Sequence, residues 1–208
     1  MLTIALTKGR IEEPVVNLLD QAGYGMANVR NKKRELIFND EHQAIRYCLV
    51  KAADSVTYIN QGAVDVAFVG SDVIAESDRT FYEVLDLNVG RCDFVLAAPK
   101  GVDLFARDGH LKIGTKYPEF TKQYFQGKGY DVEIIKIEGS VELSPLIGVV
   151  DGIIDIMETG NTLRQNGLVV VDNIQPVSTR MIVNTASFRT KSGAISELIE
   201  RLGGVVNA

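Results

Sequence analysis

Short apolar runs alternate with amphipathic stretches along almost the whole sequence, and this alternation limits the possible folds more than any other feature. Runs with the composition of strands occupy residues 3–6, 35–38, 64–69, 93–98, 112–115, 131–137, 152–156, 169–171 and 177–184. Helical patterns occupy residues 12–22, 53–61, 118–128, 145–150, 161–166 and 193–202. Because alternating strands and helices form parallel sheets covered by helices, the sequence predicts an α/β fold.

A short internal repeat suggests two similar lobes. Gly62-Ala-Val-Asp65 precedes an apolar run and the turn Gly70-Ser-Asp72, and Gly148-Val-Val-Asp151 precedes another run and the turn Thr159-Gly160. Four-letter matches also arise by chance, but the shared context favours two lobes that each present a turn to a common cleft. We expect one lobe at residues 1–91 plus 178–208, since the last segment crosses back to it, and a second lobe at 92–177.

Composition excludes several classes of protein. A net charge of −5 argues against general nucleic-acid binding, and no run approaches the roughly 18 apolar residues of a membrane helix. The start of the chain lacks the pattern of a signal peptide. Cys48 and Cys92 fit reduced, packed thiols, and with His42 and His110 they give no zinc pattern. We expect a cytoplasmic protein without nucleic-acid or membrane partners.

The most informative segment is Asp155-Ile-Met-Glu-Thr-Gly-Asn-Thr162. It predicts a buried strand that ends in acids, followed by a turn, Thr159-Gly160-Asn161-Thr162, that opens a helix. Such a turn offers backbone N–H groups and two hydroxyls to a phosphate. Asp155 and Glu158 could hold sugar hydroxyls or a Mg²⁺ that travels with a diphosphate. Together these groups indicate a phosphoribosyl-diphosphate site.

The same turn also has a plain structural interpretation, in which Thr159 or Thr162 caps backbone amides of the helix. A Thr-Gly-x-Thr turn alone is a weak motif. The carboxylates beside this turn favour the interpretation as a ligand site. Next to a bound phosphate they would only be repelled, unless sugar hydroxyls or a metal ion lay between the carboxylates and the phosphate.

A second acidic segment is Glu138-Gly-Ser-Val-Glu142-Leu-Ser-Pro145. Ser144 followed by Pro145 fits a helix N-cap and first helical position, with Ser140 as a competing start. Helix capping explains one of the two serines. Glu142 would then lie in or just before the first turn, where it could meet a ribose or a Mg²⁺.

The first lobe offers cations and permissive backbone at the ends of its strands. Thr7-Lys8-Gly9-Arg10 joins a strand to a helix, which places two cations and a flexible backbone where a polyphosphate could bind. Arg34 precedes a predicted strand and is the only attractive anion ligand in the charged run 30–34. The turn at Gly70 and Asp72 could touch a base or its ribose. For each of these, a solvated cation or a simple turn with an Asp cap is the plainer alternative.

No Ser-His-Asp or Cys-His set stands out in the sequence. Displacement at C1 of a ribosyl diphosphate does not require one, because diphosphate is a good leaving group when cations hold it. The protein then contributes orientation and electrostatic stabilisation.

Together these residues resemble the ATP phosphoribosyltransferase family, over most of the chain from Leu6 to about Phe188. The resemblance is carried by Leu6-Thr-Lys-Gly-Arg10, Gly62-Ala-Val-Asp65, Leu85-Asp-Leu87 with Gly90-Arg-Cys92, Thr115-Lys-Tyr-Pro118, Gly139-Ser-Val-Glu-Leu-Ser-Pro-Leu146 and Asp155-Ile-Met-Glu-Thr-Gly-Asn-Thr-Leu-Arg164.

The resemblance implies an α/β fold of two lobes, like the type II periplasmic binding proteins, with the active site in the cleft between them. It implies that N1 of ATP attacks C1 of phosphoribosyl diphosphate with inversion, with Mg²⁺ delivered by the substrates and no metal site of the protein's own. Residues 155–162 would bind phosphoribosyl diphosphate. The remaining groups would serve catalysis (Glu142, Asp155, Glu158) and the ATP and diphosphate side (Lys8, Gly9, Arg10, Arg34, Lys51, Gly70, Asp72).

Two positions depart from the family pattern in the first lobe: Lys51 replaces a common Arg, and Ser71 a common Lys. Lys51 keeps the charge but loses the bidentate fork. The length resembles that of the short members, which lack a histidine-binding regulatory domain. The resemblance therefore implies a homodimer that assembles with a regulatory subunit similar to histidyl-tRNA synthetase.

Two alternatives remain at this point. A non-catalytic solute-binding module of the same fold would explain two lobes, but not the acids beside a phosphate turn. A purine-salvage or orotate phosphoribosyltransferase typically has two adjacent acids before the turn, whereas Asp155 and Glu158 are separated here by two residues.

Overall fold

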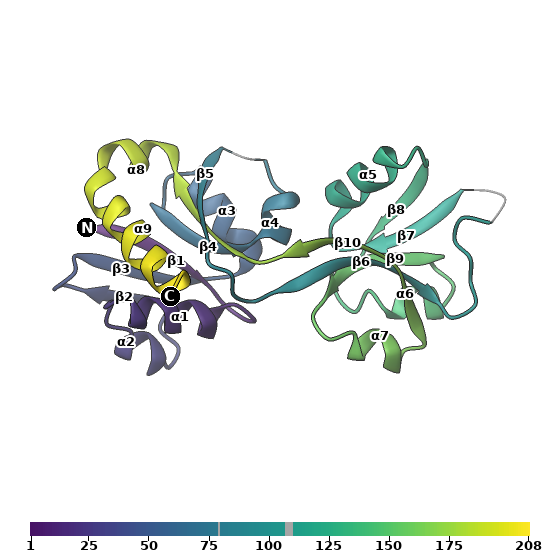
Figure 1. The fold of residues 1–208 in the computed structure, drawn as a ribbon, viewed down its shortest axis with the longest axis horizontal. Coiled ribbons are helices and arrows are strands. Elements are labelled where there is room, and N and C mark those ends of the chain that lie inside the picture. The colour runs from purple at the N-terminus through teal and green to yellow at the C-terminus, as the bar shows by residue number, and fades with distance from the viewer. Residues whose placement is uncertain (79, 107–109) are drawn as a thin grey trace. The chain divides into compact units, whose positions relative to one another are not determined.

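The protein is described by a computed structural model that covers residues 1–78, 80–106 and 110–208. The chain folds as two compact units (Figure 1). Unit 1 comprises Met1–Gly90 and Ser178–Ala208, and unit 2 comprises Arg91–Val177. The chain therefore passes between the units twice, at residues 90–91 and 177–178.

Among the residues described, unit 1 is built on a six-stranded sheet in the order β2-β3-β1-β4-β11-β5. Its strands are β1 (Leu2–Thr7), β2 (Ile37–Asp40), β3 (Ile45–Val50), β4 (Val66–Gly70), β5 (Phe81–Asp86) and β11 (Thr179–Asn184). β1 pairs in parallel with β3 and β4. The other strands pair in an antiparallel manner. Because β1, β3 and β4 are parallel, the turns that follow them lie at one edge of the sheet.

Helices cover both faces of this sheet: α1 (Glu12–Gln21), α2 (Ala27–Arg30), α3 (Ala52–Asn60), α4 (Ser71–Ala75), α8 (Thr185–Thr190) and α9 (Ser192–Val206). Ile4 and Leu6 pack with α1 and α9, whose buried residues recur at helical spacing. Ala5, between them in the strand, packs on the other face with α3 and α4. Each face thus has its own apolar core.

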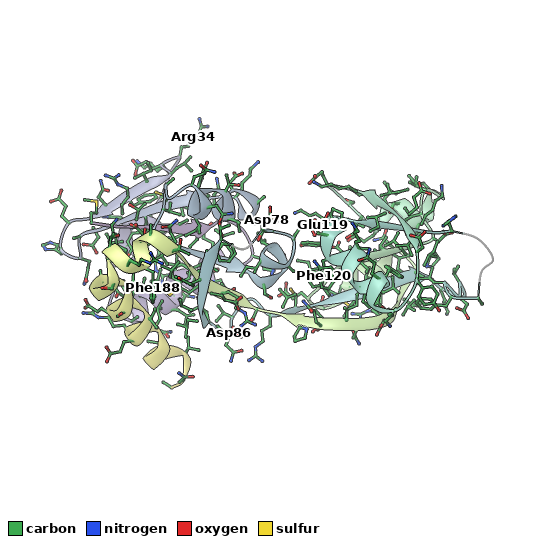
Figure 2. All side chains as sticks on the ribbon, turned by 90° about the horizontal axis from the view of Figure 1, so that it is seen from above. Arg34, Asp78, Asp86, Glu119, Phe120 and Phe188 are labelled. Carbon is green, nitrogen blue, oxygen red and sulfur yellow. The ribbon has the colours of Figure 1, made fainter. Side chains whose placement is uncertain are left out.

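Unit 2 has a five-stranded sheet, among the described residues, in the order β10-β6-β9-β7-β8. Its elements are β6 (Cys92–Pro99), β7 (Leu111–Thr115), α5 (Pro118–Gly127), β8 (Val132–Lys136), α6 (Leu143–Leu146), β9 (Gly152–Met157), α7 (Asn161–Gln165) and β10 (Leu168–Val177). Phe120 of α5 stacks on Phe94 with ring centroids 3.8 Å apart, on one face of the sheet (Figure 2). Val95 packs on the other face with Val141 and Val150, which flank α6, and with Leu163 of α7.

The two sheets repeat one arrangement. β3-β1-β4-β11-β5 in unit 1 corresponds to β8-β7-β9-β6-β10 in unit 2, with the same parallel and antiparallel pairings. β4 and β9, the strands that follow the two copies of the sequence repeat, take equivalent places. The predicted repeat is therefore confirmed at the level of strand topology.

Several predicted elements need correction. Strands β3 and β5 and helices α2, α4 and α8 were not predicted, and β10 continues to Val177 instead of ending at residue 171. α6 spans only Leu143–Leu146, so Ser144 lies inside it and is not its N-cap residue. The Ser144 hydroxyl donates to Val141 O at 2.7 Å, whereas a capping hydroxyl would accept from a backbone N–H.

Candidate functional site

The loop after β9 has the predicted form of a strand, a polar turn and a helix start. β9 ends at Met157, and Glu158 and Thr159 are exposed. Gly160 is the N-cap residue of α7 with φ of +71°, a conformation that side chains other than glycine rarely adopt. Residues 158–162 are hereafter called the phosphate loop. Its exposed hydroxyls and turned backbone leave polar groups available to a ligand.

Within the phosphate loop, Thr159 rather than Thr162 acts on the helix start. Its Oγ1 accepts a hydrogen bond from Asn161 N at 3.4 Å. Arg164 reaches back from α7 and donates to Thr159 O at 3.1 Å and to Asn161 Oδ1 at 2.5 Å. Sequence reasoning missed Arg164, since an exposed Arg on a helix is usually only solvated. Its spacing of four residues from Gly160 was the available signal.

The other two predicted acids of unit 2 come from β9 and the start of α6. Asp155 shares its sheet face with Ile153 and Met157, and this face also packs Val141, directly before Glu142, and Leu163 of α7. Its Oδ1 accepts a hydrogen bond from Ile156 N at 2.8 Å. Glu142 is half-buried and is the N-cap residue of α6, as the sequence suggested. Asp155, Glu142 and the phosphate loop therefore all belong to one side of unit 2.

In unit 1, three predicted residues from separate turns come together. Arg10 donates to Gly90 O, and its Nη2 lies 3.8 Å from the position that a Cβ on Gly70 would take. Asp72 is buried, and its Oδ1 occupies the space of that Cβ, so only glycine fits at residue 70. The turns after β1 and β4 thus meet around Gly70.

Buried hydroxyls that sequence reasoning missed join these turns. Thr7 Oγ1 donates to Phe68 O at 2.7 Å and lies 2.8 Å from Ser55 Oγ. Lys8 N donates to Val50 O at 2.8 Å, which links the turn after β1 to the end of β3. The sequence analysis named Thr7 as the first residue of the Thr7-Lys8-Gly9-Arg10 motif but gave its hydroxyl no role, because the partners of that hydroxyl come from distant parts of the chain.

Ser71 is one of the two departures from the family pattern. It exchanges two hydrogen bonds with Ser178, the first residue after the chain returns from unit 2 to unit 1. Ser71 N donates to Ser178 O at 2.9 Å, and Ser178 N donates to Ser71 Oγ at 3.2 Å. The residue that replaces a common Lys is therefore tied to the backbone of the passage.

The predicted cations Lys8, Lys51 and Arg34 are all exposed. Lys51 is the N-cap residue of α3, directly after β3. Arg34 extends from the loop before β2 (Figure 2), which begins at Ile37 and not at residue 35 as predicted. The sequence assigned Arg34 because of a strand beside it, and that reason is removed.

Two further properties concern metals and membranes. Within residues 1–78, 80–106 and 110–208, no three His, Cys, Asp or Glu side chains cluster in a way that could hold a metal ion. None of the helices in the described parts of the chain has the length and apolar character needed to cross a membrane.

The family model of HisG, ATP phosphoribosyltransferase, matches residues 51–204. The ATP phosphoribosyltransferase of Clostridium novyi is 48% identical over 206 residues, which are 98% of this chain and 97% of the relative. That of Lactiplantibacillus plantarum is 50% identical over 206 residues, 99% and 94% of the two chains.

Solved structures agree with the sequence comparisons. A chain of the ATP phosphoribosyl transferase (HisG:HisZ) complex from Thermotoga maritima superposes with a TM-score of 0.86 at 34% identity, covering 100% of this chain and 99% of that one. The periplasmic aliphatic sulphonate binding protein SsuA from Escherichia coli gives a TM-score of 0.61 at 12% identity, covering 99% and 72%. The latter supports the predicted type II periplasmic-binding-protein fold alone. The chain itself belongs to the ATP phosphoribosyltransferase (HisG) family.

Proposed function

We propose that this chain catalyses the reaction for which its family is named. N1 of ATP attacks C1 of 5-phosphoribosyl 1-diphosphate with inversion, which gives phosphoribosyl-ATP and diphosphate in the first step of histidine biosynthesis. The observation that carries the proposal is the exposed phosphate loop directly after a strand that bears Asp155, in a chain about half identical to named relatives. The separation of Asp155 from Glu158 continues to disfavour the salvage-type transferases.

On unit 2, the proposed roles follow from the polar groups that each residue offers. The hydroxyls of Thr159 and Thr162 and the N–H groups of Gly160 and Asn161 donate to the 5-phosphate. Hydrogen bonds to an ionised group are about twice as strong as neutral ones. Asp155 and Glu158 accept from the ribose hydroxyls, and Glu142 faces the reacting carbon from α6. Acceptors that are held in place before the reaction cost little reorganisation when charge develops, and Asp155 is held in this way by Ile156 N.

On unit 1, the proposed binding partners are ATP and the departing diphosphate. Lys8, Lys51 and Arg34 supply exposed positive charge, and Gly9 (φ +102°) allows close approach of the backbone. Gly70 and Asp72 form the buried part of this surface, and the exposed Arg10 lies beside them. The Arg10 guanidinium can donate hydrogen bonds to a diphosphate that leaves with negative charge, and so stabilise it.

The carboxylates present suit Mg²⁺, which prefers oxygen ligands and commonly binds one or two carboxylates together with substrate phosphates. Asp155, Glu158 and Glu142 provide such oxygens. A Mg²⁺ that arrives with the substrates would neutralise charge on the diphosphate leaving group. No protein nucleophile is needed, because the adenine nitrogen attacks directly and the chain orients the two substrates.

The proposal extends to assembly and compartment. The Thermotoga maritima structure is a HisG:HisZ complex, which supports a regulatory partner subunit for this chain as well. We propose a homodimer that binds a regulatory subunit similar to histidyl-tRNA synthetase, in the cytoplasm. Light scattering of the chain with and without that partner tests the assembly, and a monomer that does not shift on mixing contradicts it.

The activity is tested by incubating the chain with ATP, phosphoribosyl diphosphate and Mg²⁺, alone and with the regulatory partner, and by mass spectrometry of the products. Phosphoribosyl-ATP is the expected product. Adenine, hypoxanthine and orotate serve as competing acceptors, and a product from one of them but not from ATP would assign a different transferase. In the same assay, Glu158→Gln should lower turnover more than it weakens ATP binding.

A further inference from the structure

Arg164 is an exposed cation of α7 whose guanidinium is nevertheless engaged by the phosphate loop. One nitrogen, Nη2, donates both to Thr159 O at 3.1 Å and to Asn161 Oδ1 at 2.5 Å. The other, Nη1, lies 3.1 Å from the position that a Cβ on Gly160 would take. The guanidinium therefore binds Thr159 and Asn161 and lies beside Gly160 between them.

The contact with Thr159 O fixes a peptide plane. In a planar trans peptide the carbonyl and the following N–H point in opposite directions. Because Thr159 O faces Arg164, the N–H of Gly160 faces the opposite side of the loop. The loop then presents this donor without having to rotate a peptide when a phosphate arrives.

The contact with Asn161 orients a side-chain amide in the same way. Its Oδ1 accepts from Arg164, so its Nδ2 donors point away from the guanidinium. At Gly160, the close approach of Arg164 Nη1 and of Met157 Sδ (3.0 Å from the same Cβ position) covers one face of the glycine. Any side chain at residue 160 would displace one of these neighbours, in addition to the strain of its positive φ.

We propose that Arg164 is a positioning residue for the phosphate loop, which acts through Thr159 O and Asn161 and prepares the loop for the 5-phosphate of phosphoribosyl diphosphate. This inference rests on the proposed function of the loop. A loop ordered before binding loses less conformational entropy on binding, and affinity rises accordingly. Since the guanidinium is exposed, its contacts add little to the stability of the fold.

The test is calorimetric binding of phosphoribosyl diphosphate with Mg²⁺ to the full chain and to matched variants. Arg164→Ala should raise the dissociation constant about tenfold, while ATP binding and the thermal midpoint stay unchanged. Gln165→Ala, at the neighbouring exposed position of α7, is the control and should bind as the parent does. Arg164→Lys keeps the charge but not the planar fork, and should recover only part of the affinity.

A double-mutant cycle distinguishes positioning from simple charge attraction. If Arg164 acts through Asn161, the combined Arg164→Ala and Asn161→Ala variant should lose less affinity than the product of the two single losses. Independent, multiplicative losses would overturn the assignment, as would full recovery by Arg164→Lys or equal weakening of ATP and phosphoribosyl diphosphate.

The two levels of the proposal fail in different ways. If the parent chain does not bind phosphoribosyl diphosphate, the proposed function of the loop falls, and the role of Arg164 falls with it. If the parent binds and Arg164→Ala binds equally well, only the role of Arg164 is removed. If Arg164→Ala has a lowered thermal midpoint, Arg164→Lys is measured in its place. An affinity below that of the parent then supports the role of Arg164, and an affinity equal to that of the parent removes it.

Discussion

The two copies of the sequence repeat share one backbone arrangement but differ in what surrounds it. Asp65 N donates to Thr3 O and Asp65 Oδ2 accepts from Thr3 N, at 2.8 and 2.7 Å. Asp151 makes the same pair of contacts with Lys112, at 2.8 and 2.9 Å. In each unit, the Asp before one central strand thus binds the backbone of the neighbouring parallel strand, β1 or β7.

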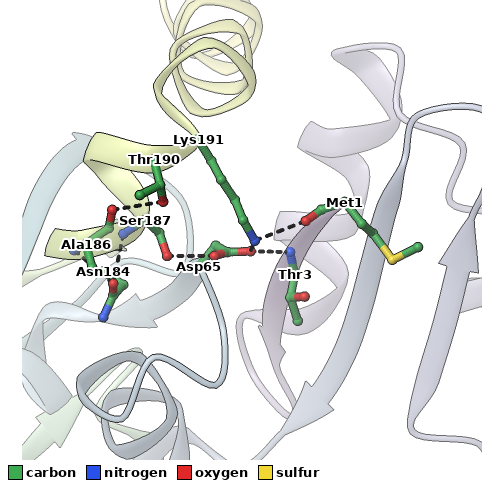
Figure 3. Close-up of polar contacts among 8 residues, drawn as sticks. All are labelled: Met1, Thr3, Asp65, Asn184, Ala186, Ser187, Thr190 and Lys191. Carbon is green, nitrogen blue, oxygen red and sulfur yellow. Dashed lines mark hydrogen bonds and ion pairs between the residues drawn. The ribbon is translucent and has the colours of Figure 1, made fainter.

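The difference lies in the C-terminal segment of the chain. Only Asp65 is buried, and it also accepts from Ser187 Oγ at 2.6 Å and from Lys191 Nζ at 2.7 Å (Figure 3). Lys191 Nζ donates to Met1 O at 3.1 Å as well. These residues, with Thr3, are called the Asp65 cluster. In unit 1 the repeat has become part of a buried structural network, whereas Asp151 is half-exposed.

The turns at the far ends of the two strands differ in a matching way. After β4, Gly70 and Asp72 are buried and Ser71 is tied to Ser178. After β9, Glu158, Thr159 and Thr162 are exposed. One topology therefore carries a largely buried turn in unit 1 and a more exposed turn in unit 2. Burial and exposure, more than strand order, distinguish the two turns.

Removing Asp65 is expected to have the largest effect. Asp65→Ala leaves Lys191, Ser187 and Thr3 N without their acceptor, and should lower the free energy of unfolding by about 3 kcal/mol. Urea denaturation followed by circular dichroism measures this difference. A loss as small as that of Asp151→Ala would mean that the C-terminal residues add nothing to the cluster.

Thr162→Ala should have the next largest effect, and on binding instead of stability. Loss of one donor to an anionic phosphate should weaken phosphoribosyl-diphosphate binding by about 2 kcal/mol, or roughly 30-fold. The urea midpoint should barely move, because Thr162 is exposed. Calorimetry and denaturation of the same preparation give both quantities, and normal binding would remove Thr162 from the phosphate site.

Asp151→Ala should cost about 1 kcal/mol of unfolding free energy, the value of one hydrogen bond to a half-exposed carboxylate. This variant is the matched partner of Asp65→Ala, because both remove the same contact to a neighbouring parallel strand. If it proved the more damaging of the two, the order of importance inferred from burial would be reversed.

The smallest effect concerns pH. Burial raises the pKa of Asp65, but hydrogen bonds from Lys191, Ser187 and Thr3 N outweigh it, so the pKa lies below its usual value of 3.8. A lowered folded-state pKa stabilises the protein above the unfolded pKa, and this contribution is lost as pH falls through the folded value. The stability difference between the parent and Asp65→Asn should therefore be constant near neutral pH and narrow below pH 3.8. Urea denaturation across that range measures it, and a widening gap would contradict the sign.

The sequence predicted the layered fold and the repeat, since both rest on periodic patterns that local residues impose. It missed β3 although the buried Ile45 and Tyr47 alternate with the exposed Arg46, because the strand is short and directly follows a polar turn. It missed α8 because its cap, Asn184, ends a long extended run, although Asn184 Oδ1 accepts from Ala186 N and Ser187 N at 3.0 Å. It shortened β10 because an edge strand with register shifts carries polar residues such as Asn173 and Gln175.

For the candidate site, sequence reasoning found the phosphate loop because its residues are adjacent in the chain. It did not find contacts between distant turns, such as Arg10 with Gly90 or Thr7 with Phe68 and Ser55. Those depend on strand order, which a single sequence does not state. Arg164 was missed for another reason: its spacing from Gly160 was visible in the sequence, but its backward reach to Thr159 depends on the rotamer of its side chain.

The place of β11 has a consequence for synthesis on the ribosome. β11 lies between β4 and β5 in the sheet of unit 1, yet it is made after all of unit 2. While the chain emerges, residues 1–90 lack the strand that joins β5 to the others, and β4 keeps an unpaired edge that can associate wrongly. Unit 2 has every strand available earlier. Unit 2 can therefore fold before unit 1, although it is synthesised later, because unit 1 waits for β11.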